Sequence, residues 1–299
     1  MSAARPRLSV LVVARDQAGA VRQLLTSLAQ QALPRAAWEL VLVDDGSTDA
    51  LAEVAQEFEA RIPLSLVRQR PSGPVSARLL GLYLARGEAI LALEPDDVAP
   101  PGLLQAHDQF HRVRTEKCAG LAGPLRPVAD PSPEPASAAL WRADPILAAA
   151  GRHRLAGPID LRDCWGARWS VKRAFVVELH GSHHGPVTGG HPLELAARLR
   201  AEQVEMEFSE VAACWSAERL DLASACRRMS ALGAAAIRIA SVRRKWRLRP
   251  WLGQWPGWSL LVPLLRLVPG PSAALRASLL AGLREARADV VAPHRVSFR

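Results

Sequence analysis

The first hundred residues alternate between short, largely apolar runs and longer segments in which apolar residues recur with helical spacing. Four runs have the length of a β-strand: residues 8–13, 39–43, 64–67 and 88–93. Because these runs are continuous, they are typical of strands buried on both faces of a sheet. Between the first two runs, Val21, Leu24, Leu25 and Leu28 fall on one face of a helix. The repeated order of strand and helix predicts an open parallel sheet flanked by helices.

The ends of three predicted strands are expected to meet. Right-handed crossovers place the carboxyl ends of the first, second and fourth strands at one edge of the sheet. The loops after Val13, Val43 and Leu93 should therefore share a crevice, where open α/β sheets bind their ligands. Two of these loops are acidic, residues 44–49 and 94–97.

The second acidic loop, Glu94-Pro95-Asp96-Asp97, has the chemistry of a cation site. Clustered carboxylate oxygens suit a hard divalent cation such as Mg²⁺ or Mn²⁺, which would bring phosphate groups with it. The alternative is a turn rich in Asp and Pro that only caps the next helix. The sequence contains neither Gly-x-Gly-x-x-Gly nor a Gly-Lys-Ser/Thr phosphate-binding loop, which disfavours a dinucleotide fold or an ATPase of that type.

Three local features carry narrower predictions. Asp16 is expected to cap the helix after the first strand. Gly87 is expected to end a helix over residues 75–86. The segment 120–151 contains six prolines and is expected to be irregular.

Composition narrows the class of protein. The 299 residues have room for one large or two small domains, and 49% are hydrophobic, which is enough for a core. No apolar run reaches the length of a membrane span, and the amino terminus lacks the pattern of a secretory signal. Four dispersed cysteines predict a reduced, cytoplasmic protein with ordinary core thiols.

The net charge of +9 is concentrated at the carboxyl end. Residues 1–150 carry 15 Lys and Arg against 17 Asp and Glu, whereas residues 227–299 carry 14 against 2. From Leu222 onwards, apolar residues keep helical spacing beside a basic face, and four tryptophans follow between residues 246 and 258. Such a tail favours an anionic membrane surface, here the inner face of the cell membrane. The alternative is a basic lid that packs on the rest of the chain; no reader motif supports nucleic-acid binding.

Several segments together resemble a known family. SVLVVARD (9–16), WELVLVDDGSTD (38–49) and SARLLGLYLARGEAILALEPDD (76–97) are similar to the nucleotide-diphospho-sugar transferase domain of family 2 glycosyltransferases. The resemblance implies the GT-A fold, a Rossmann-like open mixed α/β sheet flanked by helices, and the basic amphipathic helical tail predicted above follows it. It divides the chain into a domain over residues 1–215 and a tail over residues 216–299. Within the domain, residues 1–118 form the nucleotide-sugar half and residues 119–215 the acceptor half.

The resemblance also implies roles for five residues. Asp44 and Asp45 correspond to the acidic pair whose first carboxylate hydrogen-bonds the nucleotide base. Arg78 corresponds to an arginine near the diphosphate, which suits a guanidinium group. Glu94 and Asp96 fall on the Asp-x-Asp motif, with Glu in place of the first Asp and Asp96 at the position that binds Mg²⁺ or Mn²⁺.

The acceptor half departs from the family at the general base. Residues 189–199 resemble the segment in which an acidic pair takes the proton of the acceptor hydroxyl, but His191-Pro192 stands in place of that pair. His191 has a usable pKa near neutrality, and Glu194 lies one helical turn on, so these two are the candidate catalytic residues. The alternative is that His191-Pro192 only begins a helix.

The leading prediction is an inverting, metal-dependent enzyme that moves a sugar from a UDP- or GDP-sugar to a hydroxyl acceptor, such as a lipid-linked one, in envelope or polysaccharide biosynthesis. One alternative is a binding or scaffold protein on the same fold, impaired in catalysis because the acidic pair is replaced. Another is a nucleotidyltransferase, although residues 13–16 do not supply the Gly-rich basic loop that such enzymes use.

Overall fold

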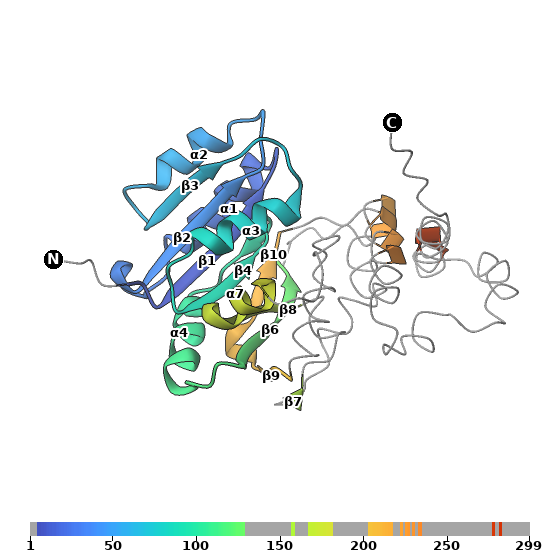
Figure 1. The fold of residues 1–299 in the computed structure, drawn as a ribbon. Helices are drawn as coiled ribbons and strands as arrows, with labels where there is room; N and C mark the ends of the chain where they lie inside the picture. Colours follow the sequence, from blue (N-terminus) through green and yellow to red (C-terminus); the bar gives the residue numbers. More distant parts are fainter. Residues whose placement is uncertain are drawn as a thin grey trace, which may run out of the picture. The chain divides into compact units, whose positions relative to one another are not determined.

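The computed structural model describes residues 5–128, 157–158, 167–181 and 203–217, and short helical stretches between residues 222 and 282. The chain divides into two compact units, Met1–Asp130 with Ala149–Glu218 and Pro131–Ala148 with Arg219–Arg299. The strands and helices labelled in Figure 1 belong to the first unit. The domain boundaries expected at residues 118 and 215 stay predictions.

Four parallel strands form the first half of the sheet (Figure 1). They lie in the order β3, β2, β1, β4 and comprise β1 Leu8–Ala14, β2 Trp38–Asp44, β3 Leu64–Arg68 and β4 Ala89–Leu93. In register, Leu8 lies opposite Trp38 on one side and Ala89 on the other. Each strand begins and ends within one residue of a predicted apolar run, and the carboxyl ends share one edge. Both predictions are therefore confirmed.

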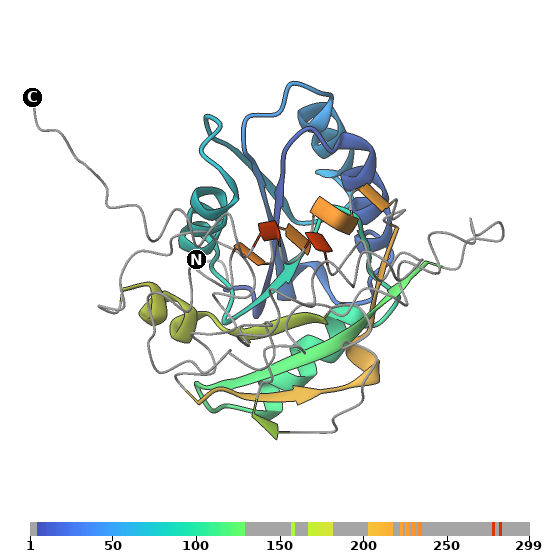
Figure 2. The ribbon, with the colours of Figure 1, turned by 90° about the vertical axis from the view of Figure 1, so that its right-hand side faces the viewer.

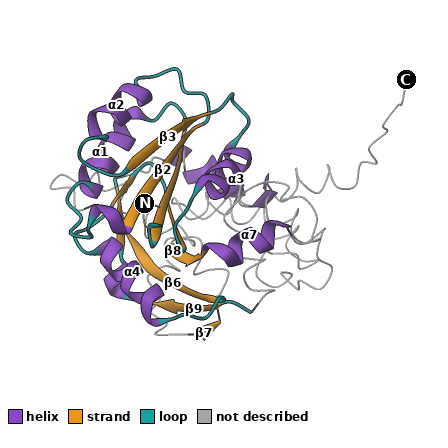
Figure 3. Cartoon of the chain, turned by 60° about the vertical axis from the view of Figure 1, so that its left-hand side comes forward, coloured by secondary structure: helices purple, strands orange, loops and turns teal. Residues whose placement is uncertain are grey.

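Helices cover both faces of this sheet. They are α1 Ala18–Leu28, α2 Leu51–Phe58, α3 Pro74–Leu84, α4 Leu103–Val113 and α7 Arg173–Gly181. Figure 3 shows α1, α2 and α4 on one side of the strands and α3 and α7 on the other. The predicted apolar stripe of α1, from Val21 to Leu28, is buried. Helix α3 lies so close to the sheet that a Cβ at Gly81 would overlap the side chain of Leu11.

The second half of the sheet is mixed. It contains β8 Ala167–Lys172, β6 Ala119–Pro127, β9 Glu205–Phe208, β10 Cys214–Ser216 and the short strands β5 Asp97–Val98 and β7 Gly157–Pro158. Strand β8 runs antiparallel between β4 and β6, and in Figure 2 the green β6 lies between the yellow-green β8 and the orange β9. Strand β5 pairs antiparallel with β10. Because β5 follows the acidic loop after β4, this pairing ties the loop to the second half of the domain.

The local prediction for Gly87 is wrong, and so is the prediction for the first residues of the segment 120–151. Helix α3 ends at Leu84, and Gly87 lies instead against β1, where a Cβ would come 2.5 Å from the backbone nitrogen of Ser9. The region expected to be irregular begins with a regular strand, β6, that contains Pro124. Residues 123 and 124 fall between the stretches of β6 that pair with β9 and β10, so the missing N–H of the proline breaks neither ladder. Residues 129–151 of that region lie outside the described residues.

Within the described part of the chain, no helix combines the length and the apolar character needed to cross a bilayer.

Candidate functional site

The loops after β1 and β2 are joined by hydrogen bonds at the carboxyl edge of the sheet. Asp16, at a positive φ of 52°, accepts hydrogen bonds on Oδ1 from the backbone N–H and the hydroxyl of Thr48, at 2.7 and 3.0 Å. Its own backbone N–H donates to Ser47 Oγ at 3.0 Å. The predicted cap by Asp16 is wrong, because Asp49 Oδ2 accepts the N–H of Ala18 at 2.8 Å.

Asp44 ends β2 and is almost fully buried, with 1% of its surface exposed. Its Oδ1 accepts the backbone N–H of Ser47 at 2.7 Å. Its Oδ2 lies 3.4 Å from Nε of Arg68, a side chain that is mostly exposed and also donates to the carbonyl oxygen of Ser47 at 2.5 Å. Asp44 therefore holds the turn that follows β2, and its second oxygen faces the guanidinium group of Arg68 at the solvent boundary.

Asp45 holds the loop that leads into α3. Its Oδ1 accepts bonds from Gln69 Nε2 at 2.6 Å and from the N–H of Ser72 at 2.8 Å, and its Oδ2 accepts the N–H of Gly73 at 2.9 Å. Burial raises the pKa of this carboxyl, but the three hydrogen bonds and the nearby Arg15 outweigh burial and bring the pKa below its ordinary value. Asp45 is thus held as a carboxylate.

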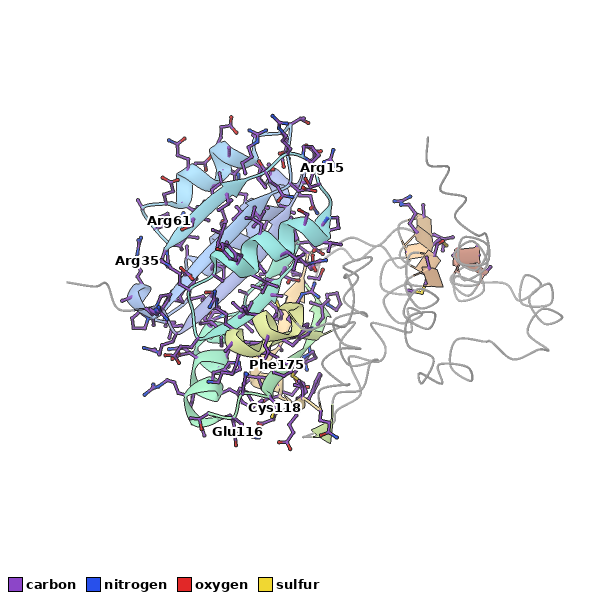
Figure 4. The ribbon with its side chains drawn as sticks, in the orientation of Figure 1. Arg15, Arg35, Arg61, Glu116, Cys118 and Phe175 are labelled. Atoms are coloured by element: carbon purple, nitrogen blue, oxygen red, sulfur yellow. The ribbon has the colours of Figure 1, made fainter. Side chains whose placement is uncertain are left out.

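Arg15 is a further cation at this edge that the sequence did not single out. It follows β1, its side chain is about half exposed, and its Nε lies 3.7 Å from Asp16 Oδ2. Figure 4 shows Arg15 at one edge of the sheet and Arg35, which precedes β2, at the opposite edge. The only signal for Arg15 in the sequence was the position of this residue directly after a predicted strand.

Arg78 and Glu94 are brought together from α3 and the end of β4. Arg78 Nη2 donates to Glu94 Oε1 at 3.0 Å, and both side chains are about one third exposed. The guanidinium and the carboxylate therefore pair with each other at the surface of the site. Asp44 and Asp45, by contrast, hold the loops after β2 and β3.

The acids that follow Glu94 have different environments. Asp96 is partly exposed, and its Oδ2 accepts the hydroxyl of Ser216 at 2.8 Å. Asp97 is fully buried and forms a two-pronged ion pair with Arg168, with Nε–Oδ2 and Nη2–Oδ1 distances of 2.5 and 2.8 Å. Burial raises the pKa of Asp97 to about 6, against the opposing effect of the guanidinium.

The residues present fit a cation held jointly by protein and ligand. Within the described ranges, no group of three or more His, Cys, Asp or Glu side chains could hold a metal ion unaided. Mg²⁺ is commonly bound by one or two carboxylates together with the phosphates of a substrate. Asp96, which is partly exposed at the carboxyl edge, provides a suitable first carboxylate. His191 and Glu194, the candidate catalytic residues, lie outside the described residues.

The part of the chain that carries this edge of the sheet matches a known protein family. Residues 9–119 match the model of the family described as "Glycosyl transferase family 2". These residues form a family 2 glycosyltransferase domain. The domain contains β1 to β5 and all of the loops described above. The match to the family model confirms the resemblance seen in the sequence.

Curated relatives of the family 2 domain match over short stretches. The poly(ribitol-phosphate) beta-N-acetylglucosaminyltransferase TarS of Staphylococcus aureus is 32% identical over 93 residues, which are 30% of this chain and 16% of TarS. The beta-monoglucosyldiacylglycerol synthase of Nostoc sp. is 31% identical over 114 residues, 36% of this chain and 24% of the relative. The matched stretches thus span less than a third of either relative.

Solved structures extend the likeness beyond the family 2 domain. The mannosyltransferase PcManGT of Pyrobaculum calidifontis, in complex with GDP-Man and Mn²⁺, has a TM-score of 0.62 and 21% identity; the match covers 96% of this chain and 88% of that one. TarS residues 1–349 in complex with UDP has a TM-score of 0.55 and 15% identity, covering 95% of this chain and 91% of that one. At these identities the likeness concerns the fold, and it confirms the predicted GT-A architecture.

Proposed function

We propose that this protein is a glycosyltransferase that moves a sugar from a UDP- or GDP-sugar to a hydroxyl acceptor, with inversion at the anomeric carbon. The observation that carries the proposal is the convergence of the loops after β1, β2 and β4 on one edge of a family 2 domain. Relatives with this domain act on poly(ribitol-phosphate) or make a glucosylated diacylglycerol, which supports an envelope polymer or a lipid-linked acceptor here.

The side chains at this edge have the chemistry that donor binding needs. Asp44 Oδ2, which faces Arg68 at the solvent boundary, can accept an N–H group of a base, and Asp45 holds the adjacent loop in place. Arg78 can exchange its bond to Glu94 for the oxygens of a diphosphate. Asp96 would hold Mg²⁺ or Mn²⁺. When bound, this ion would neutralise charge on the leaving diphosphate. His191 or Glu194 would take the proton of the acceptor hydroxyl, and one base suffices for a single inverting displacement.

A second candidate is a binding or scaffold protein that holds a nucleotide-sugar without turnover. Two observations favour it. The family's acidic pair is replaced by His191-Pro192, and Glu94 stands in place of Asp and is engaged with Arg78. A scaffold would still need the carboxyl edge for binding, so only turnover separates the two candidates.

The test is a screen of UDP- and GDP-sugars with Mn²⁺, in which released nucleoside diphosphate is measured. We expect slow donor hydrolysis with one donor, and a loss of roughly 100-fold or more in Asp96→Asn because a neutral amide binds a divalent cation poorly. Glu57→Gln is the matched control, because it also replaces a carboxylate by an amide. Glu57 on α2 forms an exposed ion pair with Arg22 on α1, and this variant should keep the wild-type rate. Metal-dependent binding of UDP or GDP without turnover of any donor would support the scaffold instead.

A further inference from the structure

The acidic loop after β4 is closed by its last residue. The backbone N–H of Asp97 donates to the carbonyl oxygen of Glu94 at 3.0 Å, and Asp97 Oδ2 accepts the backbone N–H of Glu94 at 2.7 Å. Asp97 therefore fastens both ends of the turn that carries Asp96. Since both bonds involve Asp97, the position of the turn depends on where this side chain is held.

Arg168, on β8, holds that side chain. Its guanidinium reaches both oxygens of Asp97, and the pair is largely shielded from water. A carboxylate with both oxygens in a two-pronged pair, and one of them also bonded to a backbone N–H, has little capacity left for a cation. Glu94 also acts electrostatically on Arg168, so one buried positive charge offsets part of the acidity of the loop.

Ser216, at the end of β10, holds Asp96 from the other side. Its hydroxyl donates to Asp96 Oδ2 at 2.8 Å, and the backbone N–H of Ala217 donates to the carbonyl oxygen of Asp96 at 2.8 Å. Ser216 is 2% exposed and lies opposite Asp97 in the β5–β10 ladder. The described residues place no hydrogen bond on Oδ1 of Asp96, so this oxygen remains available to a ligand.

We infer that Arg168 and Ser216 are positioning residues that select Asp96, rather than its neighbour Asp97, as the carboxylate that binds the divalent cation. Arg168 sequesters Asp97, and Ser216 fixes the orientation of Asp96 by occupying one of its oxygens. Both come from the second half of the sheet, so the geometry of the cation site depends on strands outside residues 9–119. This inference rests on the proposed function, because it assigns the cation site used in donor binding.

Mn²⁺ binding to the full chain tests this inference independently of turnover. Free Mn²⁺ is measured by electron paramagnetic resonance with UDP or GDP present, and the Mn²⁺ dependence of donor hydrolysis is measured in parallel. We expect Ser216→Ala to weaken Mn²⁺ binding about 3- to 10-fold, the effect of one lost hydrogen bond of ordinary strength. In Arg168→Gln we expect a loss of 10-fold or more, because the turn moves and Asp97 is released. The apparent KM for Mn²⁺ should rise accordingly, with the affinity for metal-free nucleotide unchanged.

A second two-pronged ion pair in the same compact unit, with its carboxylate buried and its guanidinium partly exposed, provides the control. Arg7 binds Asp108 with the same two-pronged geometry, with Nε–Oδ1 and Nη2–Oδ2 distances of 2.6 and 2.8 Å. Arg7→Gln should lower thermal stability without changing the affinity for Mn²⁺ by more than twofold. The double variant Asp97→Asn/Arg168→Gln removes both charges, and we expect it to bind Mn²⁺ more tightly than Arg168→Gln alone.

Three possible outcomes separate this inference from the proposed function. If Arg168→Gln does not fold, Ser216→Ala decides the question, because it removes only one hydroxyl. Wild-type affinity for Mn²⁺ in Ser216→Ala, and in Arg168→Gln where it folds, would overturn the inference and leave the proposed function standing. Failure of the wild-type chain to bind Mn²⁺ with either nucleotide would overturn both.

Discussion

Gly46 is the residue at which the conformation of the site depends most directly on side-chain size. It follows the acidic pair Asp44-Asp45 with a φ of +78°, and a Cβ built on it would lie 2.5 Å from two ring carbons of Pro71. A left-handed conformation is unfavourable for residues with a Cβ, and here the added methyl group would also meet the ring. Only glycine satisfies both conditions.

We therefore predict that Gly46→Ala lowers the free energy of unfolding by about 1–3 kcal/mol, the usual cost of a strained backbone position. The loop ordered by Asp45 should shift as well, so nucleotide binding should weaken. Urea unfolding and UDP titration measure the two effects. Gly19→Ala is the control, because a Cβ there meets no atom within 4 Å and the residue lies in α1. Equal stability of the two variants would contradict the prediction.

At the scale of single residues, the sequence indicated which acids lie at the strand ends but not how they are engaged. Asp96 and Asp97 are adjacent and chemically identical, yet one is partly exposed and the other fully buried. The difference arises from Arg168, 71 positions away. No local pattern distinguishes this arginine from the others in the chain.

At the scale of elements, α4 and β8 share a buried polar cluster formed by His107, His111 and Ser170. The Ser170 hydroxyl lies 2.7 Å from His107 Nδ1 and 2.8 Å from His111 Nε2. His107 Nε2 and His111 Nδ1 have no hydrogen-bond partner among the described residues. Burial lowers the pKa of His107 to about 3, and burial together with Lys172 lowers that of His111 to about 4. Both rings are therefore neutral at physiological pH.

This cluster predicts a loss of stability in mild acid. In the unfolded chain these rings take up protons near pH 6.5, whereas in the folded chain His111 does so only near pH 4 and His107 only near pH 3. The stability that is present above pH 6.5 is therefore lost as the pH falls toward 4. For His111 alone the loss is on the order of 3 kcal/mol. Thermal unfolding of wild type and His111→Gln between pH 4 and pH 8 measures it. The variant should show a shallower pH dependence, and parallel curves would contradict the assignment.

Strand β6 shows how element prediction failed where local and tertiary preferences differ. Its two prolines, Pro124 and Pro127, suggested an irregular segment, yet residues 119–125 are buried in the sheet. The strand exists because β8 pairs with it along one side and β9 and β10 share the other. By contrast, the four parallel strands were predictable because a continuous apolar run of that length is itself characteristic of a buried strand.

At the scale of the whole molecule, the basic tail is the feature whose role remains a proposal, because most of it lies outside the described residues. The cluster Arg243, Arg244, Lys245 and Arg247 precedes three of the four tail tryptophans. A basic residue near an anionic membrane surface contributes about 1 kcal/mol, and tryptophan favours the headgroup region. Together these residues support peripheral attachment.

We predict that the full chain sediments with vesicles that contain phosphatidylglycerol, and that replacing these four residues with Gln weakens the attachment roughly 100-fold or more. Raising the salt concentration should also weaken the attachment, because exposed charges are screened. Vesicles of phosphatidylcholine alone are the control. Equal binding of both vesicle types, or none by the full chain, would exclude an electrostatic membrane anchor and favour a lid.

The sequence by itself determined the order of the first four strands and the helices between them, the edge at which the loops after β1, β2 and β4 meet, and the resemblance to family 2. These features follow from local patterns, since apolar periodicity and short motifs are read within a few residues of one another. Only the tertiary structure decided which side chains pair across that edge. The bonds of Asp97 to Arg168 and of Asp96 to Ser216 join residues 71 and 120 positions apart. Such partners are chosen by strand pairing and burial, which no short stretch of the chain specifies.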